Sequence, residues 1–204
     1  MRPPAIPIPR IFPIFPETMG LVLGVTGPNA AGKGEVSAYL LTLGFATHSL
    51  SDIVREEAAA RGLPPEREHL IRIGTLLREQ GGLGVLAERL LPRLDGWDVV
   101  DSIRNPAEVE TLRQVPGFVL IGVDAPAALR FARSRLRARP GDPGSFAEFV
   151  ARERQENSAN PAGQQLRATF VLADRVIDNN GDLDLLHLKI DDLLRSLGAV
   201  SRAR

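Results

Sequence analysis

The stretch Gly27-Pro28-Asn29-Ala30-Ala31-Gly32-Lys33-Gly34 fits the phosphate-binding loop pattern G-x-x-x-x-G-K. An apolar run of strand type, residues 21–26, comes directly before it, and a run with apolar residues at helical spacing, residues 35–41, follows it. A glycine-rich turn from strand to helix directs several backbone N–H groups at one point, where the helix N-terminus adds partial positive charge. The stretch therefore predicts a polyphosphate site extending from Gly27 to Glu35, with Lys33 reaching the outer phosphates.

Two details of this loop narrow its class. Lys33 is one of only two lysines, the other being Lys189, in a chain with 23 arginines, and a compact ammonium suits a position among phosphate oxygens. The residue after the lysine is Gly34, where the usual Ser or Thr would offer Mg²⁺ a hydroxyl. A metal ion would then be held by water, by a carboxylate elsewhere, or by both. Adenylate kinases also read G-K-G here, which favours small-molecule kinases.

Composition limits the function classes. A chain of 204 residues with 44% hydrophobic and 25% charged residues suits one globular domain, which we expect over residues 19–200. Its formal net charge of zero lacks the basic footprint of a nucleic-acid-binding protein. The absence of cysteine excludes disulfides and zinc–thiolate sites, and no apolar run has the length of a membrane span. These features predict a cytoplasmic enzyme that binds neither nucleic acid nor membrane.

The first 18 residues differ from the rest of the chain because they contain six prolines. Proline interrupts helices and removes donors from sheets, and the segment lacks the continuous apolar core of a secretory signal. We expect a disordered tail over residues 1–18, or translation starting at Met19. The alternative is a polyproline ligand for a partner protein.

Beyond the loop, strand patterns alternate with helical patterns. Strands are expected at residues 21–26, 45–50, 98–101, 118–123 and 176–178. Helices are expected after the loop and at residues 52–61, 65–94 with a break at 81–82, 105 onward, 126–139, 145–156, 161–173 and 182–197, with a turn at 140–144. This alternation predicts an α/β fold: a five-stranded parallel sheet in a three-layer α/β/α P-loop NTPase, with helical acceptor-binding and lid regions. Ligands of such sheets bind at the carboxyl ends of the strands.

Charged residues follow two of these strand ends. Ser51-Asp52-Ile53-Val54-Arg55 comes after the second strand and is similar to the T-G-D-x-x-R run of adenylate kinases, whose arginine meets the acceptor's phosphate. The third strand ends at Asp101, an arrangement of Walker-B type that can order Mg²⁺ through water. Arg104 follows the same strand end, and its guanidinium can make two parallel hydrogen bonds to a phosphate. The alternative for Arg55 is a solvated surface pair.

A helix rich in arginine follows the fourth strand. Arg130, Arg133 and Arg137 share one helical face, whereas Arg135 and Arg139 lie on another. Such a cluster repels itself unless an anion is present, which suggests a mobile lid over phosphates, with Arg133 and Arg137 as catalytic candidates. Two further arginines of the next helix, Arg152 and Arg154, can close over the phosphates from the other side. The alternative is that several of these arginines pair on the surface with Glu148, Glu153 or Glu156.

From about Gly20 to Leu194 the chain resembles a functionally uncharacterised microbial family of P-loop ATPases related to dephospho-coenzyme A kinase and to nucleoside and deoxynucleoside monophosphate kinases. The resemblance is carried by motifs at residues 27–36, 51–58, 70–78, 99–105, 130–139 and 173–181. It implies a P-loop fold and ATP as ligand, and it leaves the acceptor open. The run at 173–181 is similar to the end of dephospho-coenzyme A kinases, which implies that Asn179 lies near the nucleotide.

These observations predict a phosphotransferase that uses Mg-ATP and a small phosphorylated acceptor, and that is a monomer or homodimer. Lys33 and the loop amides hold the donor, Asp101 lies behind the waters of Mg²⁺, and Arg55 and Arg104 hold the acceptor. Asp52 is the candidate that orients an acceptor hydroxyl. The alternative is a regulatory module that binds and hydrolyses ATP to switch a partner, although a switch has no second phosphate for such arginines to hold.

Overall fold

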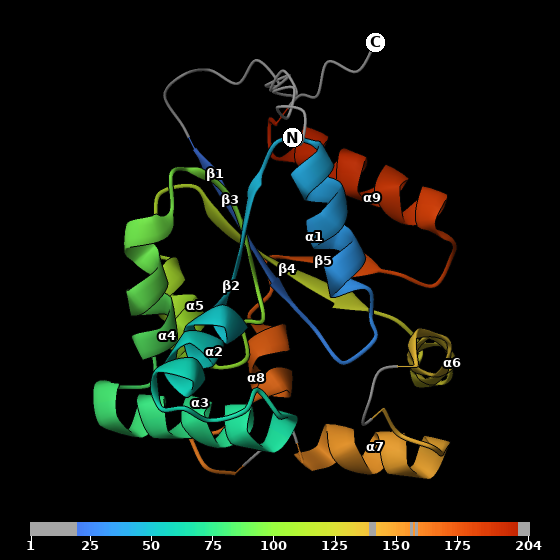
Figure 1. The fold of residues 1–204 in the computed structure, drawn as a ribbon. Coiled ribbons are helices and arrows are strands. Elements are labelled where there is room, and N and C mark those ends of the chain that lie inside the picture. The colour runs from blue at the N-terminus through green and yellow to red at the C-terminus, as the bar shows by residue number, and fades with distance from the viewer. Residues whose placement is uncertain (1–19, 139–141, 156, 158, 200–204) are drawn as a thin grey trace, which may run out of the picture.

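A computed structural model describes residues 20–138, 142–155, 157 and 159–199. Within them, five parallel strands form one sheet in the order β2-β3-β1-β4-β5 (Figure 1). Their bounds are β1 (Leu21–Thr26), β2 (Ala46–Ser49), β3 (Trp97–Asp101), β4 (Phe118–Asp124) and β5 (Arg175–Asp178). The five-stranded parallel sheet is therefore confirmed, and the phosphate loop leaves its central strand.

Helices cover both faces of the sheet and its carboxyl edge (Figure 1). Helices α1 and α9 lie on one face, and α2 to α5 with α8 lie on the other, which gives the predicted three layers. Helices α6 and α7 lie together at the carboxyl edge. The bounds are α1 (Lys33–Thr42), α2 (Leu50–Ala60), α3 (Arg67–Gly81), α4 (Val85–Leu90), the short 3₁₀ helix η1 (Leu91–Arg93), α5 (Pro106–Leu112), α6 (Ala127–Arg137), α7 (Phe146–Gln155), α8 (Leu166–Val171) and α9 (Leu183–Ser196).

The core lies on both sides of β1, all six residues of which are buried. Leu23 and Val25 pack toward α1 and α9, whereas Val22 packs toward α2 to α5. A strand that is apolar at nearly every position suits the middle of a parallel sheet with two covered faces. Each such fully buried side chain contributes about 1.5–3 kcal/mol, so the strand that carries the phosphate loop is anchored from both faces.

The predicted helix at 161–173 was wrong in its extent, because the structure has a helix only over Leu166–Val171. The segment before it is held as a loop by the connection between β3 and α5. Asn105 Nδ2 donates to the carbonyls of Pro161 (2.7 Å) and Gly163 (3.2 Å), and the Gln165 N–H donates to the Arg104 carbonyl (2.8 Å). A tertiary contact therefore replaces the first turns of the expected helix.

Two predicted features fall partly or wholly on residues that the structure does not describe. The proline-rich segment 1–18 lies outside the described residues, and of the turn predicted at 140–144 only residues 142–144 are described. Among the described residues, none of the helices combines the length and the apolar composition that a membrane crossing requires.

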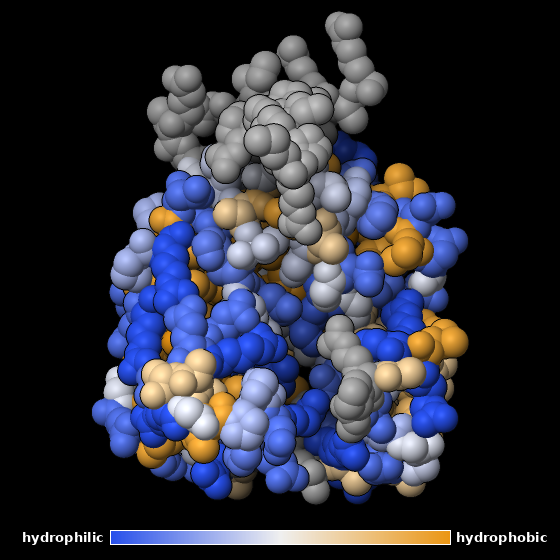
Figure 2. All heavy atoms as spheres, viewed as in Figure 1, coloured by the Kyte–Doolittle hydropathy of each residue, from blue (hydrophilic) through white to orange (hydrophobic). Residues whose placement is uncertain are grey.

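Hydrophilic residues gather around a hollow on the face shown in Figure 2, between the half of the molecule that holds α2 and α3 and the half that holds α6 and α7. The hollow lies at the carboxyl edge of the sheet, where the phosphate loop and the loop after β3 emerge. Parallel sheets bind their ligands at this edge. The predicted site residues come from elements that border it.

Candidate phosphate-binding site

Two glycines of the phosphate loop have backbone conformations that other residues rarely adopt. Gly27 has φ +139°, and a Cβ added there would lie 2.1 Å from the Val123 carbonyl oxygen. Gly32 has φ +107°, and a Cβ added there would lie 2.1 Å from the Asn179 amide nitrogen. Both positions require glycine because of backbone conformation and close packing. Helix α1 then begins at Lys33, so the first N–H groups of the helix, which lack carbonyl partners within it, border the loop.

Asn179, at the end of β5, is buried against the loop. Its Nδ2 donates to the Ala31 carbonyl (2.8 Å), and its backbone N–H donates to the Asp124 carbonyl (2.7 Å). Arg133 Nη1 in turn donates to the Asn179 carbonyl (2.9 Å). Asn179 was predicted to contact the nucleotide itself. In the structure its side chain supports the loop that would contact the nucleotide.

Lys33 lies at the centre of several charges. Its Nζ donates to the carbonyls of Gly27 (2.8 Å) and Pro28 (2.9 Å), so the ammonium lies across the loop. Burial, together with the charges of Arg104, Arg130 and Arg137, lowers its pKa to about 8, and the charge of Asp101 opposes this effect. Cations that come from β3 and α6 therefore act on the loop lysine. This concentration of positive charge suits a ligand with several negative charges.

Asp101 ends β3 beside an unusual backbone conformation. Ser102 has φ +64°, rare for a residue with a side chain, and its N–H donates to Asp101 Oδ1 (2.5 Å). Thr26 Oγ1, at the end of β1, donates to the Ile103 carbonyl (3.0 Å), which joins the two strand ends. Strained backbone of this kind persists where its surroundings hold it, and it gathers at functional sites.

The loop that carries Arg104 is held by a buried carboxylate. Glu108, which has no exposed surface, accepts from the N–H groups of Arg104 (2.8 Å) and Asn105 (3.0 Å) and from both Nε (3.0 Å) and Nη2 (2.6 Å) of Arg78. Asn105 also caps α5, so the two residues form a capping box. Arg104 Nη1 donates to Gln164 Oε1 (2.9 Å). Burial lowers the pKa of Arg104, and the Arg67 guanidinium lowers it further.

Asp52 and Arg55 lie together on the first turns of α2. Arg55 Nη1 donates to Asp52 Oδ1 (2.5 Å) and to Ser51 Oγ (2.8 Å), and both charged side chains are about half exposed. Three hydroxyls to which the sequence-based prediction gave no role link this pair to β3, since Ser49 Oγ lies 2.9 Å from Ser51 Oγ and 3.0 Å from Ser102 Oγ. Their positions directly after two strand ends were the only signal for them in the sequence.

The arginines of α6 divide among three contacts. Arg130 is buried, binds Glu153 of α7 (3.1 Å for Nη2–Oε2) and donates to the carbonyls of Ala125 and Asn29. Arg133 donates to the carbonyls of Asn179 and Gly181, and Arg137 pairs with Asp142 (Nη2–Oδ1 2.9 Å). The three share a face as predicted, but Arg130 and Arg133 fasten α6 to its neighbours.

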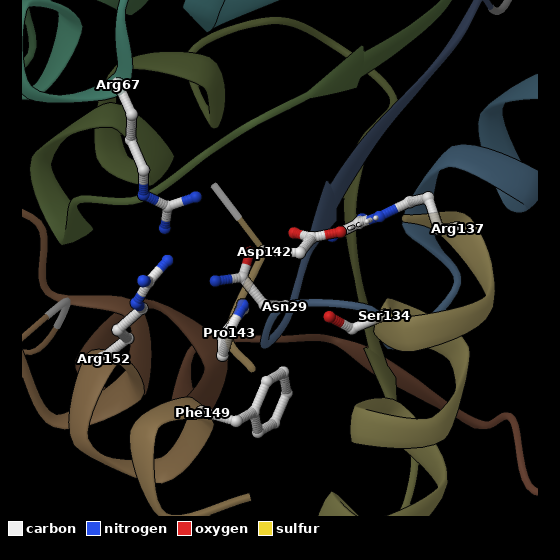
Figure 3. Close-up of a pocket in the computed structure, with 8 residues that line it drawn as sticks. All are labelled: Asn29, Arg67, Ser134, Arg137, Asp142, Pro143, Phe149 and Arg152. Carbon is white, nitrogen blue, oxygen red and sulfur yellow. Dashed lines mark hydrogen bonds and ion pairs between the residues drawn. The ribbon is translucent and has the colours of Figure 1, made fainter. Parts of the chain in front are cut away.

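Figure 3 shows a pocket that the sequence-based prediction did not define. Arg67 begins α3, and nothing in its spacing relates it to the strand ends. In Figure 3 it reaches toward Arg152 of α7 and toward Asn29 of the phosphate loop. The pocket, called the arginine pocket below, is lined by Asn29, Arg67, Ser134, Arg137, Asp142, Pro143, Phe149 and Arg152.

The residues present suit a nucleotide phosphate chain with Mg²⁺. Among the described residues no group of three or more His, Asp or Glu can hold a metal by itself. Mg²⁺ usually keeps several waters and binds one or two carboxylates together with substrate phosphates, and Asp101 can supply such a carboxylate. A Cβ added at Gly34 would meet nothing within 4 Å, so the place of the missing hydroxyl is open.

Comparison with known proteins places the chain in a family. A UPF0200 protein of Hyperthermus butylicus is 34% identical over 181 residues, which are 87% of this chain and 95% of that protein. The chain belongs to the UPF0200 family. A UPF0200 protein of Methanothermobacter thermautotrophicus is 34% identical over 182 residues, covering 87% of this chain and 90% of that protein. A UPF0200/UPF0201 protein of Archaeoglobus fulgidus is also 34% identical, and the chain spans 55% of its length. No protein-family model matches the chain.

Solved structures with a similar fold include named kinases. TT1252 from Thermus thermophilus has a TM-score of 0.57 at 24% identity, covering 88% of this chain and 98% of that one. Shikimate kinase from Bacteroides thetaiotaomicron has a TM-score of 0.56 at 15% identity, covering 86% of this chain and 98% of that one. A sugar kinase from Janibacter sp. has a TM-score of 0.54 at 18% identity, covering 90% of this chain and 99% of that one. These similarities show that this UPF0200 chain has a kinase-like P-loop fold.

Proposed function

We propose that this chain is an ATP-dependent phosphotransferase that moves the γ-phosphate of Mg-ATP to a small phosphorylated acceptor. The acceptor classes are nucleoside or deoxynucleoside monophosphates and dephospho-coenzyme A. The observation that carries the proposal is the relation of Arg104 to Lys33. Glu108 holds the Arg104 backbone N–H (2.8 Å) on the connection after β3, outside the phosphate loop, and from there the Arg104 guanidinium is the charged side chain that most lowers the pKa of Lys33.

The presence of Arg104 as a second cation near Lys33 indicates that the site binds a second phosphate group. Two neighbouring cations repel each other, and an anion between them removes the repulsion. Lys33 and the loop N–H groups suffice for the donor's phosphates in a site that only binds ATP. Arg104, set on a separate strand end and held by Glu108, suits an acceptor that brings its own phosphate.

The chemistry follows from these positions. The bond between the γ-phosphorus and the bridging oxygen breaks, a bond to an acceptor oxygen forms, and ADP leaves. Because the transition state is loose, positioning and charge neutralisation provide most of the catalysis. Lys33 and the loop amides hold the donor, Arg104 holds the acceptor's phosphate, and Arg137 neutralises the group in transfer. Asp101 would hold Mg²⁺ through water, which would neutralise further charge on the phosphates.

The acceptor decides whether a proton must move. A monophosphate attacks with an ionised phosphate oxygen and releases no proton, whereas a hydroxyl acceptor must lose one. Asp52 is the carboxylate that would orient such a hydroxyl, and its ion pair with Arg55 holds it at the start of α2. The named kinases of similar fold act on shikimate and on a sugar. Their acceptors are not transferred to this chain, because a fold is shared by many functions.

The test is acceptor-dependent release of ADP from Mg-ATP by the full chain. Nucleoside monophosphates, deoxynucleoside monophosphates and dephospho-coenzyme A are supplied one at a time, and the phosphorylated product is identified by mass spectrometry. At least one is expected to stimulate ADP release and to gain a phosphate. ADP release that no acceptor stimulates would instead favour the regulatory ATP-hydrolysing switch.

Variants of the proposed binding residues sharpen the test. Lys33→Ala should lower turnover by an amount that corresponds to several kcal/mol of transition-state stabilisation. Arg104→Ala and Arg55→Ala should raise the acceptor KM far more than they weaken ATP binding, because both residues follow separate strands outside the phosphate loop. Equal losses of ATP affinity in both arginine variants would contradict their acceptor role.

A further inference from the structure

The arginine pocket brings together cations from three helices that are separate in the chain. Arg67 begins α3, Arg137 ends α6 and Arg152 belongs to α7. In Figure 3, Arg67 and Arg152 extend toward each other from opposite sides of the pocket, with Asn29 of the phosphate loop beside them. Three guanidinium groups that converge next to a phosphate loop form a surrounding suited to an anion with several oxygens.

Charge relations connect this pocket to the donor site. The surrounding protein lowers the pKa of Arg67, first by desolvation and then through the Arg152 guanidinium, while the Asp142 carboxylate opposes this effect. Arg67 is likewise the charged side chain that most lowers the pKa of Arg104, which in turn most lowers that of Lys33. The positive side chains therefore continue from the phosphate loop through Arg104 to Arg67.

A buried hydroxyl at the pocket wall also indicates a ligand. Ser134 is 1% exposed, and its Oγ has no hydrogen-bond partner among the described residues. Figure 3 shows this oxygen directed into the pocket. A buried hydroxyl without a partner is unfavourable because it has lost its hydrogen bonds to water. An oxygen-rich ligand in the pocket would supply the missing partner.

One carboxylate of the chain already lies in the pocket. Asp142 accepts from Arg137 at both oxygens (2.9 Å for Oδ1 and 3.3 Å for Oδ2), and its side chain is largely buried. Glu148 and Glu153 of α7 pair with Arg152 and Arg130, respectively. Asp142 is therefore the acidic side chain that lines the pocket itself.

We propose that the arginine pocket, next to Arg104, binds the phosphate group of the acceptor, with Arg67, Arg137 and Arg152 as the cations of the pocket and Ser134 as a hydroxyl donor. Asp142 occupies the pocket until that phosphate arrives and then gives way to it. The pocket's location at the phosphate loop would place the acceptor's phosphate next to the donor's. The inference rests on the proposed function for the identity of its ligand as an acceptor, and the binding itself requires only a phosphate.

Protection of arginines from phenylglyoxal, measured by peptide mass spectrometry, tests the proposal residue by residue. The probe is inorganic phosphate, added to the full chain without nucleotide. Arg67 is exposed enough to react, and phosphate is expected to slow its modification several-fold. Arg195, on α9 across the sheet and paired with Asp192, is the internal control whose modification should not change. Equal modification of Arg67 with and without phosphate would overturn the proposal.

Two variants test the other parts of the pocket. Asp142→Asn keeps the shape and removes the competing charge, so half-protection of Arg67 should need about tenfold less phosphate, the effect of roughly one charge-assisted hydrogen bond. In Ser134→Ala, half-protection of Arg67 should need more phosphate, and the free chain should not be destabilised. Ser37→Ala is its matched control, since Ser37 also has a buried hydroxyl without a described partner but lies on α1. No shift with Asp142→Asn, or equal shifts with both serine variants, would contradict the assignment.

The outcomes separate this inference from the proposed function. Phosphate protection of Arg67 without acceptor-dependent ADP release would keep the anion site and reject the phosphotransferase. Acceptor-dependent ADP release with a normal acceptor KM in Arg67→Ala would keep the phosphotransferase and reject the arginine pocket as its acceptor site. When both proposals hold, Arg67→Ala raises the acceptor KM and leaves the ATP KM unchanged.

Discussion

Asn179 and Ala31 are 148 residues apart in the chain, and a hydrogen bond of 2.8 Å from the Asn179 amide to the Ala31 carbonyl joins them. The last strand of the sheet thereby holds the middle of the phosphate loop. The contact leaves so little space that a side chain at Gly32 would collide with the amide. The shape of the loop therefore depends on a residue from the far end of the domain.

Replacement of the Asn179 side-chain amide should weaken ATP binding, although it removes no positively charged group. Asn179→Ala leaves a buried carbonyl unpaired, which costs about 1–3 kcal/mol. We expect a lower free energy of unfolding in urea and an ATP Kd about tenfold weaker. Asn180→Ala is the matched control, because Asn180 is exposed and bonds only to Asp178 in the described structure. Equal ATP affinities of the two variants would show that the loop keeps its shape unaided.

The lowered pKa of Lys33 predicts a pH dependence of donor binding. In the free chain Lys33 loses its proton near pH 8. Donor phosphates add negative charge beside the ammonium and raise its pKa in the complex. The complex therefore keeps a proton that the free chain has lost, so binding should take up protons above about pH 8 and weaken as the pH rises further.

Calorimetry of ATP binding at about pH 7 and about pH 9, in two buffers of different ionisation enthalpy, measures this uptake. Proton uptake is expected at the higher pH only. Lys33→Arg keeps its charge at both values, so its proton uptake should vanish. Proton-neutral binding by the unchanged chain at about pH 9 would exclude the charge coupling. The same pKa predicts the contribution of Lys33 to folding: the unfolded chain binds more protons between about pH 8 and the ordinary lysine value of 10.5, so this contribution to stability increases across that window.

Glu108 should be the most sensitive acidic position in the fold. Glu108→Ala leaves Arg78 buried without its carboxylate and removes the acceptor of two backbone N–H groups. Breaking a buried ion pair on one side costs about 3–5 kcal/mol, which urea unfolding would measure. Glu110→Ala should change little, because Glu110 lies on the same helix but is exposed and, among the described residues, pairs with Arg113. Similar small losses in both variants would mean that the network adds no stability.

Gly34 offers a gain-of-function test. A Cβ added at this position would meet no atom within 4 Å, so Gly34→Ser should fold normally and return a hydroxyl to the place where related loops bind Mg²⁺. ATP binding should then need less Mg²⁺, as measured by titration of the metal at fixed ATP. Gly34→Ala carries the same backbone change without the hydroxyl and should not alter the Mg²⁺ requirement. A shift of the same size in Gly34→Ala would rule out metal contact by the hydroxyl.

Helix α7 should respond to ligands because charged contacts add to the packing of Phe146 and Phe149 on Phe131 of α6. It is tied to α6 by Arg130 and Glu153, and Arg152 lines the arginine pocket. Amide hydrogen exchange over Phe146–Gln155 should slow when ATP and an acceptor analogue bind together, because each arginine gains a charge-assisted hydrogen bond. Amides of α9 provide the comparison within the same sample. Unchanged protection of α7 would identify it as part of the rigid fold.

Local sequence was sufficient for the phosphate loop and most of the sheet. The strand 21–26 is apolar at nearly every position, glycines 27 and 32 occur where the backbone must turn, and a helical pattern follows. These features act over a few residues and therefore leave a pattern in the sequence. The same holds for the ends of β2 and β3, since Asp101 ends β3 and Asp52 and Arg104 lie three residues beyond their strands.

Tertiary structure decided which of the many arginines meet the site and which fasten the fold. Arg130 and Arg133 carry the same helical spacing as Arg137, yet burial against α7 and the end of β5 gives them partners within the chain. Arg67 has no local pattern that relates it to the phosphate loop, and it reaches the pocket because α3 packs on α2 and α4 and begins near the carboxyl edge of the sheet. Side chains from distant segments converge only after packing, and spacing along one helix or strand cannot encode that convergence.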